Sequence, residues 1–232
     1  MSHIPHRVTM PSVALAVALA LLGAACGSDD RPQAAQAAVH DTAAHASTTP
    51  EDRIDPVAFH ADMRKLWEDH VTWTRLYIVS AVAGLPDLDA TAGRLLQNQA
   101  DIGEAIATFY GQDAGAALTE LLRDHILIAA DLVTAAKAGD DQGVSTHSDR
   151  WYANADEIAQ FLADANPAWP VATLQQMMRG HLDQTLAEAT ARLQGDWAAD
   201  IAEYDRIHLH ILQMADALAD GIVTQFPDRF AA

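Results

Sequence analysis

The sequence is short of several residue types that define particular kinds of protein. A single cysteine, Cys26, among 232 residues excludes a disulfide bond within the chain and any zinc site built on several cysteines. Basic residues are scarce as well, since 14 Lys and Arg stand against 32 Asp and Glu and leave a formal net charge of −18. Such a chain cannot neutralise a phosphate backbone, which excludes nucleic acid as a partner.

Aromatic residues are also few, at 6%, whereas apolar residues as a whole make up 50% of the chain. This apolar content is enough to bury one substantial core. Alanine is abundant, and alanine has the highest helix propensity of all residues. The composition therefore favours a helical protein with small packing units.

The first 25 residues have the pattern of a secretory signal peptide. Arg7 precedes an apolar run over residues 8–22, and small residues then lead to Cys26. The position of Cys26 resembles the bacterial lipoprotein signal, although Gly23 stands where a larger aliphatic residue is more usual. The resemblance implies cleavage before Cys26 and attachment of lipid to it. We therefore expect an exported protein, held at the cell membrane by lipid and facing outside the cytoplasm; an uncleaved signal anchor is the alternative.

Residues 26–55, which begin with the lipidated cysteine, have the composition of a tether. They are rich in Ala, Ser, Thr, Asp and Gln and contain almost no large apolar residue. Segments that cannot bury apolar surface stay disordered, so we predict a disordered link between the anchor and a folded domain.

From residue 56 to residue 230 the apolar residues recur at helical spacing, and Gly or Pro marks each break. Short connections place successive helices antiparallel, which predicts an all-α, up-down bundle. The six predicted helices cover residues 56–83, 88–110, 114–138, 144–165, 171–194 and 197–225.

The bundle is predicted to be a duplicated three-helix unit, with repeats over about 62–139 and 146–225. Trp67 and Trp151 are 84 residues apart, as are Pro86 and Pro170. The tripeptides that begin at His125 and His210 are both His-Ile-Leu. Such a repeat implies pseudo-twofold symmetry, with equivalent helices facing each other across a common core.

Four histidines lie on or beside the apolar stripes of four predicted helices, each near the helix midpoint. The other two helices offer amides at the same level, including Asn98 and Asn154. We expect these side chains to form one polar belt across the middle of the bundle. The four histidines are His70, His125, His181 and His210.

Buried imidazoles and amides without partners cost about 1–3 kcal/mol each, so the belt must be satisfied internally, hydrated or occupied by a ligand. Histidine is the commonest transition-metal ligand, which makes the four histidines candidate ligands of a metal ion. Trp67, Asn98 and Asn154 are the candidates for contact with a bound cofactor or small polar molecule. The aspartates that could orient the imidazoles from outside are Asp131, Asp156, Asp183 and Asp216.

The alternative is a structural or interaction lipoprotein, in which each histidine makes its own hydrogen bond and nothing binds. Enzymatic activity is the least favoured hypothesis. The sequence has no pair of Glu-x-x-His motifs, no His-Glu-x-x-His motif, no Gly-x-Ser-x-Gly motif and no phosphate-binding glycine loop.

The segment from Leu66 to Arg75 contains Trp-x-x-His-x-x-Trp-Thr-Arg, and a related segment runs from Trp151 to Asp156. Over about residues 63–230 the chain resembles a family of uncharacterised bacterial all-helical proteins that share this motif and the mid-helix histidines. The resemblance implies the helical fold and brings no activity with it.

Overall fold

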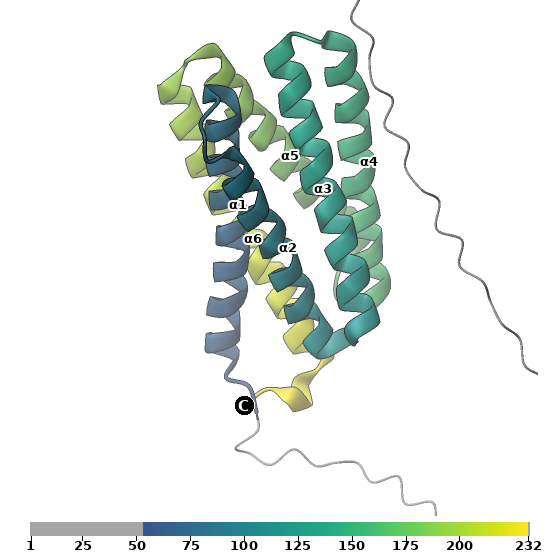
Figure 1. Ribbon diagram of the computed structural model, residues 1–232. Coiled ribbons are helices and arrows are strands. Elements are labelled where there is room, and N and C mark those ends of the chain that lie inside the picture. Colours follow the sequence, from purple (N-terminus) through teal and green to yellow (C-terminus); the bar gives the residue numbers. More distant parts are fainter. Residues whose placement is uncertain (1–52, 232) are drawn as a thin grey trace, which may run out of the picture. The chain divides into compact units, whose positions relative to one another are not determined.

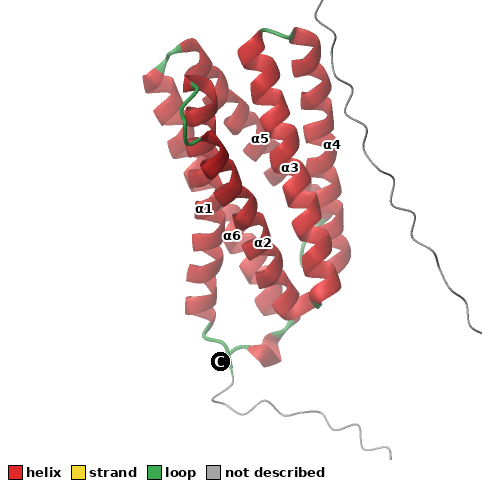
Figure 2. Cartoon of the chain, viewed as in Figure 1, coloured by secondary structure: helices red, strands yellow, loops and turns green. Residues whose placement is uncertain are grey.

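The computed structural model describes residues 53–231 (Figures 1 and 2). The predicted signal peptide, Cys26 and most of the tether lie outside the described residues. The described part is helical, with one short 3₁₀ helix, η2 (Pro227–Arg229), after the last long helix. The six α-helices are α1 (Pro56–Ala83), α2 (Leu88–Tyr110), α3 (Gln112–Ala138), α4 (Asp141–Ala165), α5 (Val171–Gln194) and α6 (Trp197–Gln225).

The predicted helix boundaries are confirmed except at the starts of α3 and α4. Helix α3 begins at Gln112, two residues earlier than predicted, because Gly111 with φ 88° lets the chain turn directly from α2 into α3. Helix α4 begins at Asp141, three residues earlier than predicted. The carboxylate of Asp140 accepts a hydrogen bond from the Gly143 backbone N–H at 3.0 Å and so caps the helix there.

The six helices form the predicted bundle (Figure 1). Each helix packs against the ones before and after it, and α6 packs back against α1. Short connections make neighbours antiparallel, so α1, α3 and α5 point the same way. Helix α1 also contacts both α3 and α5. The predicted duplication stays a prediction.

One large core cluster takes residues from all six helices. A smaller cluster of Ile78, Val133 and Ala189 joins α1, α3 and α5 nearer one end. Backbone hydrogen bonds of 2.9 Å from Ile54 to Arg229 and from Ala231 to Ile54 tie the two ends of the domain together. Among residues 53–231, no helix combines the length and the apolar character needed to cross a bilayer.

A buried ionic cluster links α1, α5 and α6. Arg75 donates to Glu188 at 2.6 Å and to Asp200 at 2.7 Å, and Arg192 donates to Asp200 at 3.2 Å. Both carboxylate side chains are only 2% exposed. Burial raises the pKa of Glu188 to about 7, because the loss of hydration outweighs the attraction of Arg75.

Candidate functional site

The structure brings three of the four predicted histidines together in the middle of the bundle. The ring centroid of His70 lies 5.5 Å from that of His181 and 6.5 Å from that of His125, and the last two are 6.3 Å apart. All three side chains are buried. They come from α1, α3 and α5, which are the three helices that point the same way.

Asn154 on α4 fixes the orientation of His125. Its Nδ2 donates to the backbone oxygen of Leu121 at 3.1 Å, so its Oδ1 is the atom that faces His125 Nδ1 at 2.8 Å. An amide oxygen only accepts, and therefore the proton of His125 is on Nδ1. The Nε2 atom of His125 is left with a lone pair.

Helix α2 contributes two completely buried amides, Asn98 and Gln99. Asn98 Nδ2 donates to the backbone oxygen of Leu66 at 3.0 Å. Gln99 Nε2 donates to the backbone oxygen of Leu95 at 2.8 Å and to Asn98 Oδ1 at 3.2 Å. The donor atoms of both amides are thus satisfied, whereas Gln99 Oε1 has no hydrogen-bond partner.

Two tryptophans complete the site. The indole of Trp67 lies 5.8 Å from the His70 ring, and the indole of Trp151 lies 5.1 Å from the His125 ring.

We call the eight side chains described above the polar layer: Trp67, His70, Asn98, Gln99, His125, Trp151, Asn154 and His181. Five buried polar atoms of the layer have no hydrogen-bond partner: Trp67 Nε1, His70 Nδ1, Gln99 Oε1, Trp151 Nε1 and His181 Nδ1.

The three imidazoles are neutral at pH 7. Burial lowers the pKa of His70 to about 3, with the nearby His125 adding to the effect and the nearby Gln99 side chain opposing it. Burial also lowers the pKa of His125 to about 4, against the opposing effect of its hydrogen bond with Asn154. Burial and the neighbouring rings lower the pKa of His181 well below its usual range. A charged imidazole would lose its hydration here without gaining a carboxylate partner.

His210 is the predicted ligand that the structure does not bring into this group. Its Nε2 donates to the backbone oxygen of Met177 at 2.8 Å, and its ring is half-buried. It lies beside Gly180, where a Cβ atom would stand 3.4 Å from the ring. The hydrogen bond across α5 and α6 therefore occupies this histidine.

The four aspartates considered as outer partners of the imidazoles serve other groups, which corrects that expectation. Arg64 pairs with Asp216, and Arg179 pairs with Asp156, in both cases at 2.5 Å. Tyr152 donates its hydroxyl to Asp183, and Asp131 lies 3.9 Å from His147. These carboxylates stand toward the outside of the bundle, and the amide of Asn154 orients His125 instead.

Within residues 53–231 the structure contains no group of three or more His, Cys, Asp or Glu side chains placed to hold a metal ion. The three imidazoles are close to one another, but His125 Nδ1 is engaged by Asn154 and no carboxylate bonds to a ring of the layer. The polar layer as it stands therefore offers hydrogen bonds rather than a coordination sphere.

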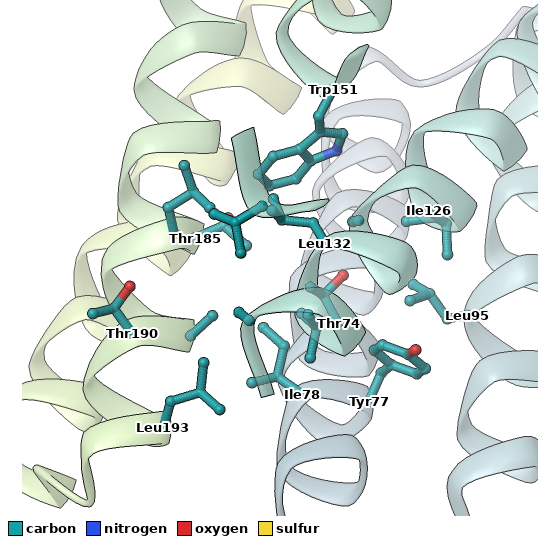
Figure 3. Close-up of a pocket in the computed structure, with 16 residues that line it drawn as sticks. Thr74, Tyr77, Ile78, Leu95, Ile126, Leu132, Trp151, Thr185, Thr190 and Leu193 are labelled. Carbon is teal, nitrogen blue, oxygen red and sulfur yellow. The ribbon is translucent and has the colours of Figure 1, made fainter. Parts of the chain in front are cut away.

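An apolar cavity of about 100 Å³ adjoins the polar layer (Figure 3). Trp151 belongs to both, since its indole lines the cavity and also contacts His125. Sequence reasoning did not select Trp151 as a site residue. The signal that could have found it is its equivalence, at an offset of 84 residues, to Trp67.

No family model, curated protein or solved structure matches this chain.

Proposed function

We propose that this protein binds a small, uncharged polar molecule in the polar layer. The proposal depends on the five buried polar atoms without partners, which come from α1, α2, α4 and α5 and gather around three touching imidazoles. Leaving a buried donor or acceptor unpaired costs about 1–3 kcal/mol, and native proteins keep few such groups. A ligand that both donates and accepts hydrogen bonds would satisfy them.

The character of the layer supports an uncharged ligand. Its imidazoles are neutral and its remaining groups are amides and indoles, so no formal charge faces the site. A cation or anion would give up its hydration without meeting an opposite charge, which costs several kcal/mol. The two indole N–H groups donate, and Gln99 Oε1 accepts.

A transition metal ion is the second candidate, favoured by one observation. His125 presents an unprotonated Nε2 while its Nδ1–H is held by Asn154, and a hydrogen bond to the nitrogen that does not bind the metal is what orients metal-ligating histidines. Binding a metal would require the rings of His70 and His181 to turn toward a common point.

We also propose that the bundle is exported and anchored by lipid on Cys26, on the strength of the sequence pattern at residues 1–26. The anchor would hold the binding domain outside the cytoplasm. There the polar layer would meet molecules of the cell envelope.

Native mass spectrometry and metal analysis of the protein purified from the cells that produce it test the binding proposal. We expect a bound organic species at close to one per chain and less than stoichiometric metal. The Trp67→Phe and Trp151→Phe variants each remove one donor and should bind about tenfold more weakly, which corresponds to about 1.4 kcal/mol. Trp73→Phe is the matched control, because Trp73 packs against Arg94 outside the layer.

Stoichiometric metal that is lost in His125→Ala would favour the second candidate instead. Formamide, urea and methanol serve as probes if no species is found. They should shift the indole N–H signals of Trp67 and Trp151 in nuclear magnetic resonance (NMR) spectra and leave that of Trp73 in place. A protein that carries no bound species and shows no such shift would have the structural or interaction role.

A further inference from the structure

The cavity beside the polar layer lies between α1, α3, α4 and α5, with Leu95 of α2 also on its wall. Figure 3 shows Trp151 at one side of it and Thr190 and Leu193 at another. Its walls are aliphatic and aromatic, with three threonines and a tyrosine, and no charged side chain lines it. Ile78, Val133 and Ala189, which form the small core cluster, are also part of the wall. The cavity thus interrupts the packing between the two core clusters.

The cavity is the next layer of the bundle after the polar layer. On α1, α3 and α5 the cavity-lining residues Thr74, Ala129 and Thr185 come four positions after His70, His125 and His181. On α2, which runs the other way, Leu95 comes four positions before Gln99. Four residues of α-helix rise about 6 Å. The same step on four helices places the cavity one turn from the polar layer.

One side chain, Trp151, belongs to both the cavity wall and the layer, and Thr185 lies one turn beyond His181 on α5. Trp151 lines the cavity and carries one of the unpartnered N–H groups. The Thr185 hydroxyl donates to the backbone oxygen of His181 at 2.9 Å, which leaves its methyl group as the apolar part for the cavity wall. The polar layer and the cavity therefore meet at Trp151.

The size of the cavity limits what it can hold. An apolar cavity of about 150 Å³ accepts benzene, which has six carbons. In proportion, a cavity of about 100 Å³ accepts an apolar group of about four carbons. Thr190 on its wall is exposed, whereas Leu95 and Trp151 are buried. The cavity accordingly extends from near the surface toward the interior.

Resting on the proposed function, we infer that the ligand is a small amphiphile: an apolar body of about four carbons lies in the cavity, and an uncharged polar head hydrogen-bonds to the polar layer. An aliphatic alcohol, aldehyde or primary amide of this length has the required chemistry. The head would accept from the Trp151 indole N–H, and the body would cover the apolar wall from Leu95 to Ile126.

The inference is tested with probes that separate head from body, added to the purified full-length protein and followed by NMR. The probes are 1-butanol, methanol, xenon, butylammonium and pentanoate. Methanol has the head alone, xenon resembles the body alone, and the last two replace the uncharged head by a charge. The observed signals are the Trp67 and Trp151 indole N–H groups for the layer and the Ile126 and Leu132 methyl groups for the cavity.

We expect 1-butanol to move both sets of signals and to bind about 50-fold more tightly than methanol, since each buried CH₂ contributes about 0.8 kcal/mol. Xenon should move only the methyl signals. Butylammonium and pentanoate should bind at least tenfold more weakly than 1-butanol, because the layer has no charge to pair with theirs.

Variants in which a larger side chain fills the cavity provide the second part of the test. Ala129→Leu places three more carbons in the cavity and should abolish the advantage of 1-butanol over methanol while the indole shifts remain. Ala136→Leu, at another point of the wall, repeats the test if Ala129→Leu does not fold. Ala117→Leu, exposed on the same helix, is the matched control and should leave the advantage intact.

Two results would overturn the inference, and they differ in what they mean for the proposed function. If 1-butanol and methanol bind equally and shift the indole signals, the layer binds a polar molecule without using the cavity. If 1-butanol and xenon shift only the methyl signals, the cavity binds apolar molecules alone, and the proposed function then loses its support as well.

Discussion

Asn154 Oδ1 accepts the Nδ1 proton of His125 at 2.8 Å, and this contact decides which nitrogen of His125 is free. Replacing Asn154 by leucine would leave the His125 Nδ1–H without a partner in the core. We expect Asn154→Leu to lower the free energy of unfolding by about 1–3 kcal/mol, measured by urea denaturation. The ¹⁵N NMR signals of the His125 ring should show a protonated Nδ1 in the wild type and a mixture of tautomers in the variant. A variant of unchanged stability would contradict the role of Asn154.

The three neutral imidazoles should make the protein sensitive to acid. Their pKa values are lower in the folded state than the usual 6.5, with about 3 for His70 and about 4 for His125, so the unfolded chain binds more protons below pH 6.5. The stability they contribute is complete above pH 6.5 and is lost as pH falls toward the folded-state values. Between about pH 5.5 and 4.5 the free energy of unfolding should fall by nearly 4 kcal/mol per pH unit for the three rings together.

Replacing one ring isolates its share of this acid sensitivity. His181→Asn removes one titrating group and should reduce the slope of stability against pH by about one third, measured by urea denaturation at a series of pH values. Trp67→Phe alters the same layer without removing a titrating group, and it should keep the full slope. Equal slopes in wild type and His181→Asn would show that the imidazole does not stay neutral on folding.

Two glycines inside helices should respond in opposite ways to the same substitution. A Cβ atom on Gly221 of α6 would stand 1.8 Å from Nε1 of Trp169, whose indole donates to the backbone oxygen of Ala217 at 3.2 Å. Gly221→Ala must displace this indole, and we expect a loss of about 3 kcal/mol or more. Gly93→Ala on α2 meets nothing within 4 Å and should stabilise the protein by about 0.5–1 kcal/mol. Thermal unfolding of the two variants measures both; a stable Gly221→Ala would place Trp169 elsewhere.

Glu188 should make the folded state less stable as pH rises through neutrality. Its pKa is raised to about 7 from 4.5, so the folded protein holds a proton there that the unfolded chain has released. Between pH 4.5 and a pH above 7 the free energy of unfolding should therefore fall by about 3 kcal/mol in total. Glu188→Gln should abolish this decrease in urea denaturation measured across the same range. Glu104→Gln, exposed on α2, should retain the loss because Glu188 still titrates. An unchanged profile in Glu188→Gln would mean that Arg75 keeps the carboxylate ionised throughout.

The proposed lipid anchor depends on one thiol. In the cells that export the protein, the wild-type chain should take up labelled fatty acid and begin at Cys26, as judged by the mass of the mature protein. Cys26→Ser should take up none. Moving the thiol by two residues, with Cys26→Ser and Ser28→Cys together, should not restore labelling, because the lipoprotein pattern fixes the position relative to residues 22–25. Labelling that persists without Cys26 would exclude this anchor.

The local pattern of the sequence was sufficient to predict six helices, most of their ends and the bundle they form. Apolar spacing, glycines and prolines act within a few residues along the chain, so the tertiary structure did not need to be known. The same spacing identified His70, His125 and His181 as inward-facing. The early start of α4 was missed because it depends on one side-chain contact, from Asp140 to Gly143.

Which inward-facing groups meet was decided only by the tertiary structure. The rotation of each helix about its axis and the crossing of neighbours fix this, and they arise from packing between different helices. His210 has the same spacing as the other three histidines, yet the crossing of α5 and α6 places it against the Met177 carbonyl instead. Packing likewise left the cavity one turn below the imidazoles, because the side chains of four helices do not fill the space between two core clusters.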